Sequence, residues 1–314
     1  MRIRIGAAYA AAAAMLPYFL IKIVWTVDGL RGGGQHDGAW SVLDWAAMNA
    51  LTGGMSGTAI LLGLALARPW GMRLPAWLLL APGWLASGFL VSLIPILPAV
   101  LIAAPPATDD PGVVPMWELT LIAVSFTGFA VGLAVAVPGY ARARWPHAFR
   151  GRVADGSDAP AALRDLLRTA GGLVAAVCVV LGLVQAYWAL GGTFGLDPVG
   201  LDARDARWHL LTANSALWTF VAAGGGWALG RGSSHARLAP TVLLTWVASG
   251  SLFAWGSWKV TFLFTATAMM PAPEPPVVRA LLNHAGALAG LLLLLVLLLA
   301  LVHRPARRDR GTTA

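Results

Sequence analysis

Apolar residues fill eight long stretches of this chain, and short polar segments separate them. A helix needs about 20 apolar residues to cross a hydrocarbon core about 30 Å thick, and backbone groups in lipid must bond within their own helix. The pattern therefore predicts an all-α, polytopic transmembrane bundle of about eight spans. The expected spans are 5–26, 45–67, 76–102, 117–137, 170–190, 210–229, 239–259 and 281–302. Pro95 and Pro98 in the third predict a kink or an early end.

The last four stretches repeat landmarks of the first four in the same order. Residues 84–88 read WLASG, and residues 246–250 read WVASG, 162 positions later. Trp25 near the end of the first stretch matches Trp188 near the end of the fifth, 163 positions later, and a Gly-rich loop follows each. This near-constant spacing predicts two four-helix repeats. Because each repeat has an even number of spans, both enter the membrane from the same side and are parallel repeats.

The repeat divides the chain into four parts. We expect a first four-span repeat at 1–139, a polar cytoplasmic linker at 140–168, a second four-span repeat at 169–303 and a basic cytoplasmic tail at 304–314. Within the linker, Asp158 followed by Ala159-Pro160 predicts an N-cap with proline in the first turn, and so the start of a short helix that runs into the fifth span.

Composition and charge agree with a membrane protein. The chain is 58% hydrophobic and 11% charged, whereas a soluble domain carries about 25% charged residues. Its net charge of +8 would suit a nucleic-acid partner, but most of the 22 basic residues gather at the ends of the chain and in alternate loops. Because Lys and Arg stay on the cytoplasmic side, we expect a multi-pass protein of the cell (plasma) membrane with both termini in the cytoplasm, and no nucleic-acid partner.

Metal and cofactor chemistry find little support in the sequence. The single cysteine, Cys178, lies in an apolar stretch, which excludes an intramolecular disulfide and favours a packing role. No acidic segment has the ordered spacing of a calcium loop, no His/Cys set has zinc spacing, and no P-loop occurs. We therefore expect no metal and no cofactor.

Polar residues within the spans gather in their outward halves. Such groups are costly at membrane depth and usually face a bundle interior or a cavity, so each is a functional hypothesis. Lys22 and Gln185 occupy equivalent places, three residues before the matched tryptophans. The candidate substrate-binding residues are Lys22, Asp28, Asp44, Asn49, Glu118, Gln185, Asn214, Lys259, Asn283 and His284.

Simpler interpretations compete with a binding role. Lys22 and Lys259 lie near the outer interface, where a lysine reaches the headgroups with its long stem. Asn49, Gln185 and Asn214 are also explained by amide hydrogen bonds between helices.

A serine and histidine pattern resembles the motifs of rhomboid intramembrane proteases. His209 and Asn214 are followed by Ser249 in an Ala-Ser-Gly triplet and then by His284. The family places its motifs on alternate spans that point the same way, whereas here they lie on consecutive antiparallel spans. Ser249 also has a twin in Ser87, with no matching histidine. We therefore interpret the repeated triplet as close helix packing.

The first span also carries a resemblance. It contains Pro17-Tyr18, Lys22 and Trp25, and the chain as a whole is rich in Ala, Gly, Arg and Trp. In these respects it resembles multi-pass integral membrane proteins of actinobacterial type. The resemblance brings no assigned activity.

Three functions fit these features. The first is a binding or transport protein for a small-molecule or lipid-like solute, with an outward-facing polar cavity between the repeats. The second is a membrane-embedded enzyme that acts on an isoprenoid or lipid-linked substrate through Asp28, Asp44 and Glu118. The third is an accessory subunit that packs against other membrane subunits through its Gly-rich faces. Membrane lipids are expected partners, and catalytic residues cannot be assigned.

Overall fold

The computed structural model describes residues 2–32, 42–102, 116–156, 159–196, 201–202, 204–263 and 277–302. Over these ranges the chain is helical and contains no strand, only an isolated antiparallel bridge between Arg152 and Arg237. The predicted all-α fold is confirmed for this part of the chain. The predicted tail at 304–314 lies outside the described residues.

Among the described residues, seven helices are long and apolar enough to cross a membrane. They are α1 (Arg2–Leu30), α2 (Val42–Ala67), α3 (Ala76–Phe89) with the 3-10 turn η2 (Val91–Leu93), α5 (Met116–Arg144), α6 (Ala161–Ala189), α9 (Leu238–Leu263) and α10 (Val277–Val302). The predicted span 210–229 falls in α8 (Ala206–Arg231), a helix of 26 residues that is not among the seven. These helices fit a membrane protein.

The third predicted span is interrupted. α3 ends at Phe89, η2 follows, and a short α4 (Leu97–Ile102) completes the segment. Between them the backbone makes tighter bonds, from the Leu93 N–H to the Leu90 carbonyl and from the Ile94 N–H to the Val91 carbonyl. Pro95 has no N–H with which to continue the α-helical pattern, so the regular helix ends before it. The early end predicted near Pro95 is confirmed, since the regular helix ends at Phe89.

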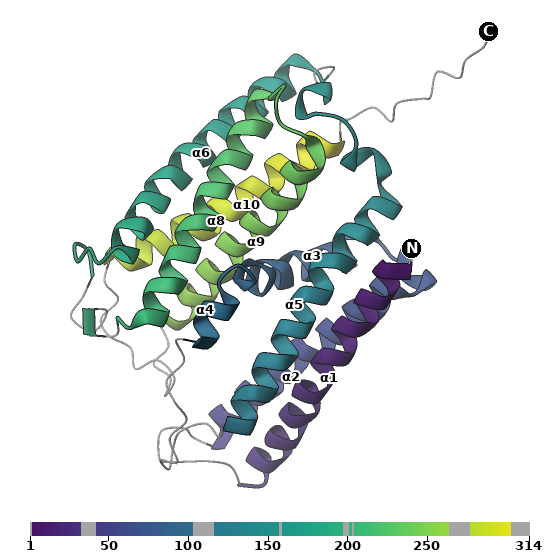
Figure 1. Ribbon diagram of the computed structural model, residues 1–314, viewed down its shortest axis with the longest axis vertical. Helices are drawn as coiled ribbons and strands as arrows, with labels where there is room; N and C mark the ends of the chain where they lie inside the picture. Colours follow the sequence, from purple (N-terminus) through teal and green to yellow (C-terminus); the bar gives the residue numbers. More distant parts are fainter. Residues whose placement is uncertain are drawn as a thin grey trace. The chain divides into compact units, whose positions relative to one another are not determined.

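The chain divides into two compact units. Unit 1 comprises residues 1–139 and 259–276. In it, α1 and α2 pair along their lengths, and α5 lies against α1 (Figure 1). Small residues allow this approach, because a Cβ added at Gly132 of α5 would lie only 2.7 Å from the Ala7 carbonyl oxygen of α1. The 3-10 turn η1 (Pro69–Met72) joins α2 to α3.

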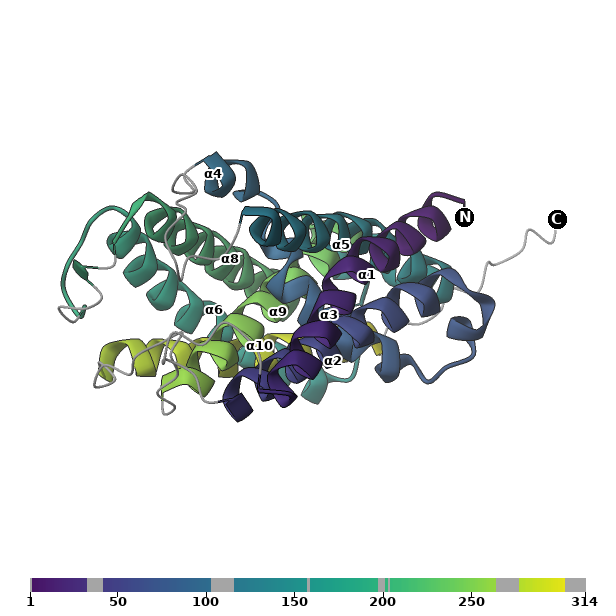
Figure 2. The ribbon, with the colours of Figure 1, turned by 90° about the horizontal axis from the view of Figure 1, so that it is seen from below.

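Unit 2 comprises residues 140–258 and 277–314. Here α6 pairs with α8, and α10 packs against both (Figures 1 and 2). Glycines again mark the contacts: a Cβ added at Gly290 of α10 would lie 2.5 Å from the Ser249 carbonyl oxygen of α9. The buried core of this unit includes Val174, Cys178, Trp218 and Leu293.

The polar segment before α6 is built into unit 2. It contains the 3-10 turns η3 (Pro146–Phe149) and η4 (Val153–Gly156). The Val153 N–H donates to the Ala236 carbonyl at 3.0 Å, and the Leu238 N–H donates to the Gly151 carbonyl at 3.0 Å. The segment expected as a linker is therefore attached to the connection between α8 and α9.

The pairs α1–α2 and α6–α8 have the same close contact at a constant sequence offset. A Cβ at Gly63 would lie 3.0 Å from the Ala8 oxygen and 3.1 Å from the Ala12 nitrogen. In unit 2, a Cβ at Gly226 would lie 3.0 Å from the oxygen of residue 171 and 3.5 Å from the nitrogen of residue 175. Each position in unit 2 is 163 residues after its counterpart, which is the spacing that also separates Trp25 from Trp188.

A second contact between the paired helices has the same 163-residue offset, but its phenylalanine and glycine are exchanged between the two helices. In unit 1, the ring of Phe19 on α1 covers Gly57 on α2, where an added Cβ would meet it at 3.2 Å. In unit 2, the glycine is Gly182 on α6 and the ring is that of Phe220 on α8, at 2.8 Å. The large and small partners have changed helices, while their positions remain 163 residues apart.

Candidate functional site

Lys22 lies between the helices of unit 1. Its ammonium donates to the Asn49 Oδ1 of α2 at 2.8 Å and lies 4.4 Å from the ring centroid of Trp25 and 5.2 Å from that of Tyr18. Asn49 is only 2% exposed, and its Nδ2 donates to the Trp45 carbonyl at 2.9 Å. Because the lysine is directed to a buried amide, this geometry favours an interhelical position over one in which the ammonium reaches the headgroups.

Three helices supply the neighbours of Lys22. Glu118, in the first turn of α5, is near enough to interact with it electrostatically. The Tyr18 side chain is buried near Thr52 of α2, and its ring packs edge-on against Phe126 of α5. One cation, one acid and three polar side chains thus lie near one another, and we define them as the Lys22 cluster: Tyr18, Lys22, Asn49, Thr52 and Glu118. Within this cluster, the hydrogen bond from Lys22 joins it to Asn49, whereas Glu118 acts at longer range.

The equivalent position in unit 2 makes a neutral bond. Gln185 Oε1 of α6 accepts from Thr219 Oγ1 of α8 at 2.9 Å. Residues 185 and 219 follow Lys22 and Ser56 by 163 positions. Asn214 is 4% exposed, and its Oδ1 has no hydrogen-bond partner among the described residues. The two units thus share an interhelical polar bond, but only unit 1 places a charge there.

The other candidate residues are not brought into these clusters by any described contact. Asp28 is exposed near the end of α1, and Asp44 belongs to α2 with its side chain outside the described part. Lys259 is exposed in the last turns of α9. Asn283 is half-buried on α10, and its backbone carbonyl oxygen would lie 2.8 Å from a Cβ added at Gly256 of α9.

The serine and histidine of the rhomboid-like pattern occupy different environments. Ser249 is fully buried in α9, and its Oγ donates to the Trp246 carbonyl at 3.0 Å. His284 is exposed on α10, and its Nδ1 lies 2.7 Å from the Ala280 carbonyl oxygen. His209 likewise contacts a backbone carbonyl, that of Ala189 at 2.9 Å. These placements agree with a packing role for the Ala-Ser-Gly triplet.

Sequence reasoning missed Tyr18 and Thr52. Both had a usable signal, because Tyr18 is four residues before Lys22 on α1, and Thr52 is three residues after Asn49 on α2. Residues at these spacings share one face of a helix. Within the described residues, no three His, Cys, Asp or Glu side chains are grouped so that they could hold a metal ion.

Comparison with known protein families finds no family model that matches this chain, and comparisons with curated proteins and with solved structures also find no match. The class of protein therefore rests on the molecule itself. It is an all-helical chain, over the described residues, whose seven long apolar helices fit a membrane protein and whose first unit contains a partly buried polar cluster.

Proposed function

We propose that the chain is an eight-span protein of the plasma membrane that binds and transports a small-molecule or lipid-like anion at the Lys22 cluster. Both termini lie in the cytoplasm, and α8 is the eighth span. Its pairing with α6, which repeats the pairing of α2 with α1, supports this topology. The shared offset of 163 residues supports an origin of the two units by duplication.

The single observation that carries the function is the charge on Lys22. A lysine costs about 2.5–3.5 kcal/mol to insert at the centre of a span. Lys22 lies nearer the outer interface, but its ammonium is directed to the buried Asn49 and not to the headgroups. The bond between Gln185 and Thr219 joins the equivalent helices of unit 2 without a charge. Packing at this position therefore does not require an ammonium, and the cost is explained if the cation binds a ligand.

The surroundings of Lys22 indicate the kind of ligand. Its ammonium has three donors, and Asn49 accepts from one of them. Trp25, Trp45 and Tyr18 provide apolar and aromatic surface beside it. A carboxylate or phosphate with an attached apolar group satisfies both features. Glu118 lies near enough to Lys22 for electrostatic interaction, and on release of the anion it would take over part of the interaction with the ammonium.

The enzyme hypothesis has weaker support. Its three proposed acids are not assembled by the described contacts, since Asp28 is exposed and only Glu118 belongs to the Lys22 cluster. The accessory-subunit hypothesis has no specific contact in its favour.

Thermal stabilisation by simple amphiphiles tests the binding function. Dodecyl phosphate, dodecanoate and dodecylammonium are added to the full chain in neutral micelles, and the unfolding temperature is measured. A ligand at 100 times its Kd adds about 2.7 kcal/mol to stability, so the two anions should raise this temperature and the cation should not. Lys22→Gln should abolish the response because it removes the ammonium that binds the anion. Glutamine should still form an interhelical hydrogen bond, as Gln185 does in unit 2, so the variant should remain folded. Lys259→Gln, the same change at an exposed lysine, is the control. Equal responses of the wild type and Lys22→Gln would refute the site.

Cysteine accessibility tests whether the site opens to the outside. Cys178 is the sole cysteine, so Cys178→Ala gives a background without thiols. In that background, Lys22→Cys should react with a membrane-impermeant methanethiosulfonate applied from outside. Val24→Cys, two residues away and 61% exposed on α1, should react slowly because it faces lipid. Equal rates at the two positions would contradict an outward-open site.

A reporter at the C-terminus tests the topology. Alkaline phosphatase folds only outside the cytoplasm, so a fusion after residue 314 should be inactive, as should one at the N-terminus. An active C-terminal fusion with an inactive N-terminal one would mean an odd number of spans and refute α8 as the eighth, whereas activity at both ends would refute the cytoplasmic orientation.

A further inference from the structure

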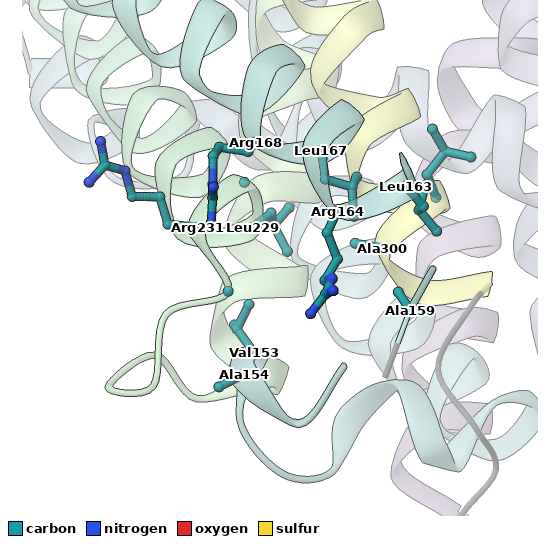
Figure 3. A pocket seen from close by; sticks show the side chains of 13 residues that line it. Val153, Ala154, Ala159, Leu163, Arg164, Leu167, Arg168, Leu229, Arg231 and Ala300 are labelled. Atoms are coloured by element: carbon teal, nitrogen blue, oxygen red, sulfur yellow. The ribbon is translucent and has the colours of Figure 1, made fainter. Parts of the chain in front are cut away.

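Unit 2 contains a pocket where α6 begins and where α8 and α10 end. It has a volume of about 250 Å³. Its wall is apolar and comes from four segments: Leu163 and Leu167 of α6, Leu229 of α8, Ala300 of α10 and Val153 of η4 (Figure 3). Pockets for complete drug-sized ligands measure about 300–1,000 Å³, so this one suits a headgroup or part of a larger molecule.

Arginines lie at the pocket together with this apolar wall. Arg164 and Arg168, four residues apart on the same face of α6, both contribute to the lining. Figure 3 shows Arg164 directed toward Val153 and Ala159, whereas Arg231 points away from the other two arginines. The guanidinium of Arg231 instead stacks on Trp227, 3.8 Å from the ring centroid.

The wall opposite the arginines is fixed by backbone bonds. The bonds from Val153 to Ala236 and from Leu238 to Gly151 hold η4 against the α8–α9 connection. The Arg152 guanidinium adds a bond to the Ser234 carbonyl at 2.8 Å. A site whose walls are held in this way binds without a large ordering cost.

These features together identify the ligand chemistry. Guanidinium groups bind phosphate through paired N–H donors, and two of them outweigh the charge of one phosphodiester. The apolar wall suits the glycerol and first methylenes of a lipid, and the pocket lies at the end of membrane-length helices, where headgroups are found. We infer that this pocket binds the phosphate of an anionic phospholipid, a site separate from the Lys22 cluster.

Native mass spectrometry of the full chain in neutral detergent tests this inference. The probes are dioctanoyl phosphatidylglycerol, dioctanoyl phosphatidylcholine and inorganic phosphate. The wild type should bind phosphatidylglycerol at least tenfold more tightly than phosphatidylcholine. Arg164→Gln with Arg168→Gln should remove this preference, whereas Arg307→Gln with Arg308→Gln, which removes the same charge from the C-terminal segment, should change it less than twofold.

Further variants separate the remaining explanations. Ala300→Leu narrows the pocket and leaves both arginines in place, so it should also weaken phosphatidylglycerol binding. This variant tests the site even if the double arginine variant does not fold. Arg164→Lys with Arg168→Lys should restore part of the affinity, because charge is kept and the paired donors are lost. Displacement of the lipid by millimolar inorganic phosphate would assign the site to free phosphate and overturn the lipid assignment. Equal losses in the pocket and tail variants would indicate attraction to net charge and overturn the site itself.

Discussion

The two adjacent glycines Gly171 and Gly172 of α6 provide a test of helix packing that needs no ligand. A Cβ added at Gly171 would lie 2.5 Å from the Gly226 carbonyl oxygen and 2.9 Å from the Gly230 Cα of α8. Both are backbone atoms, so they cannot move aside without separating the helices. A Cβ added at Gly172 would meet nothing within 4 Å. Gly171→Ala and Gly172→Ala therefore differ only in what the added methyl group contacts.

The expected free energies follow from these contacts. Replacing glycine by alanine inside a helix gains about 0.8–1.0 kcal/mol in helix propensity. Overpacking costs about 1–3 kcal/mol. Gly172→Ala should therefore stabilise unit 2, and Gly171→Ala should be less stable than Gly172→Ala by about 1–3 kcal/mol, since the propensity gain is common to both.

Equilibrium unfolding by sodium dodecyl sulfate in mixed micelles measures this difference. The far-ultraviolet circular dichroism of the two variants and the wild type should give Gly172→Ala the highest transition midpoint and Gly171→Ala a lower one. Coincident midpoints for the two variants would mean that α6 and α8 do not pack through Gly171, and the close contact described for unit 2 would be wrong.

Three further measurements address other contacts. Phe19→Gly and Gly57→Phe should each destabilise unit 1, and the double variant should recover stability with a coupling of about 0.5–3 kcal/mol in a thermal double-mutant cycle; additive losses would disprove their contact. Asn214→Leu should raise the unfolding temperature because it removes a buried oxygen that has no hydrogen-bond partner. Asn49→Leu should lower the unfolding temperature because Lys22 loses its acceptor. The opposite order would contradict both assignments. Cys178, 0% exposed, should resist N-ethylmaleimide until the protein is unfolded by detergent, as intact mass would show; rapid labelling of the folded chain would place this thiol outside the core.

The amphiphile and lipid experiments also report on different sites. If both proposals hold, Lys22→Gln loses the thermal response to the anionic amphiphiles but binds phosphatidylglycerol at Arg164 and Arg168 as tightly as the wild type. Either can therefore fail without the other.

Much of the fold could be predicted because the apolar length of each stretch reports its helix directly. Seven of the eight predicted spans correspond to helices that can cross a membrane. The ends were predicted less well. The apolar stretch begins near 170, but α6 begins at Ala161, because its first turns contain Arg164, Asp165 and Arg168. The helix start predicted at 158–160 is confirmed, with Pro160 rather than Asp158 at the N-cap position. Helical backbone bonds continue through polar residues, so an apolar pattern underestimates the length of such a helix.

The sites were harder to predict than the helices. Lys22 and Asn49 were both candidates, but their bond depends on the register between α1 and α2, which neither helix encodes alone. Arg164 and Arg168 were assigned to a polar cytoplasmic linker, because nothing in their local sequence shows that η4 folds back against the connection between α8 and α9. The constant offset of 163 residues is visible at the tryptophans, and applying it to every position relates Gly63 to Gly226 from the amino-acid sequence alone.

The exchanged phenylalanine and glycine have a consequence for how the chain assembles after synthesis. If α1 were to associate with α8 in place of its own partner, Phe19 would face Phe220 and the two rings would collide. If α6 were to associate with α2, Gly182 would face Gly57 across an empty space. Each native helix pair has one phenylalanine and one glycine at this contact, so only the native pairs fill the space between the helices without a collision. The exchange therefore disfavours pairing between a helix of one unit and a helix of the other while a newly inserted chain assembles.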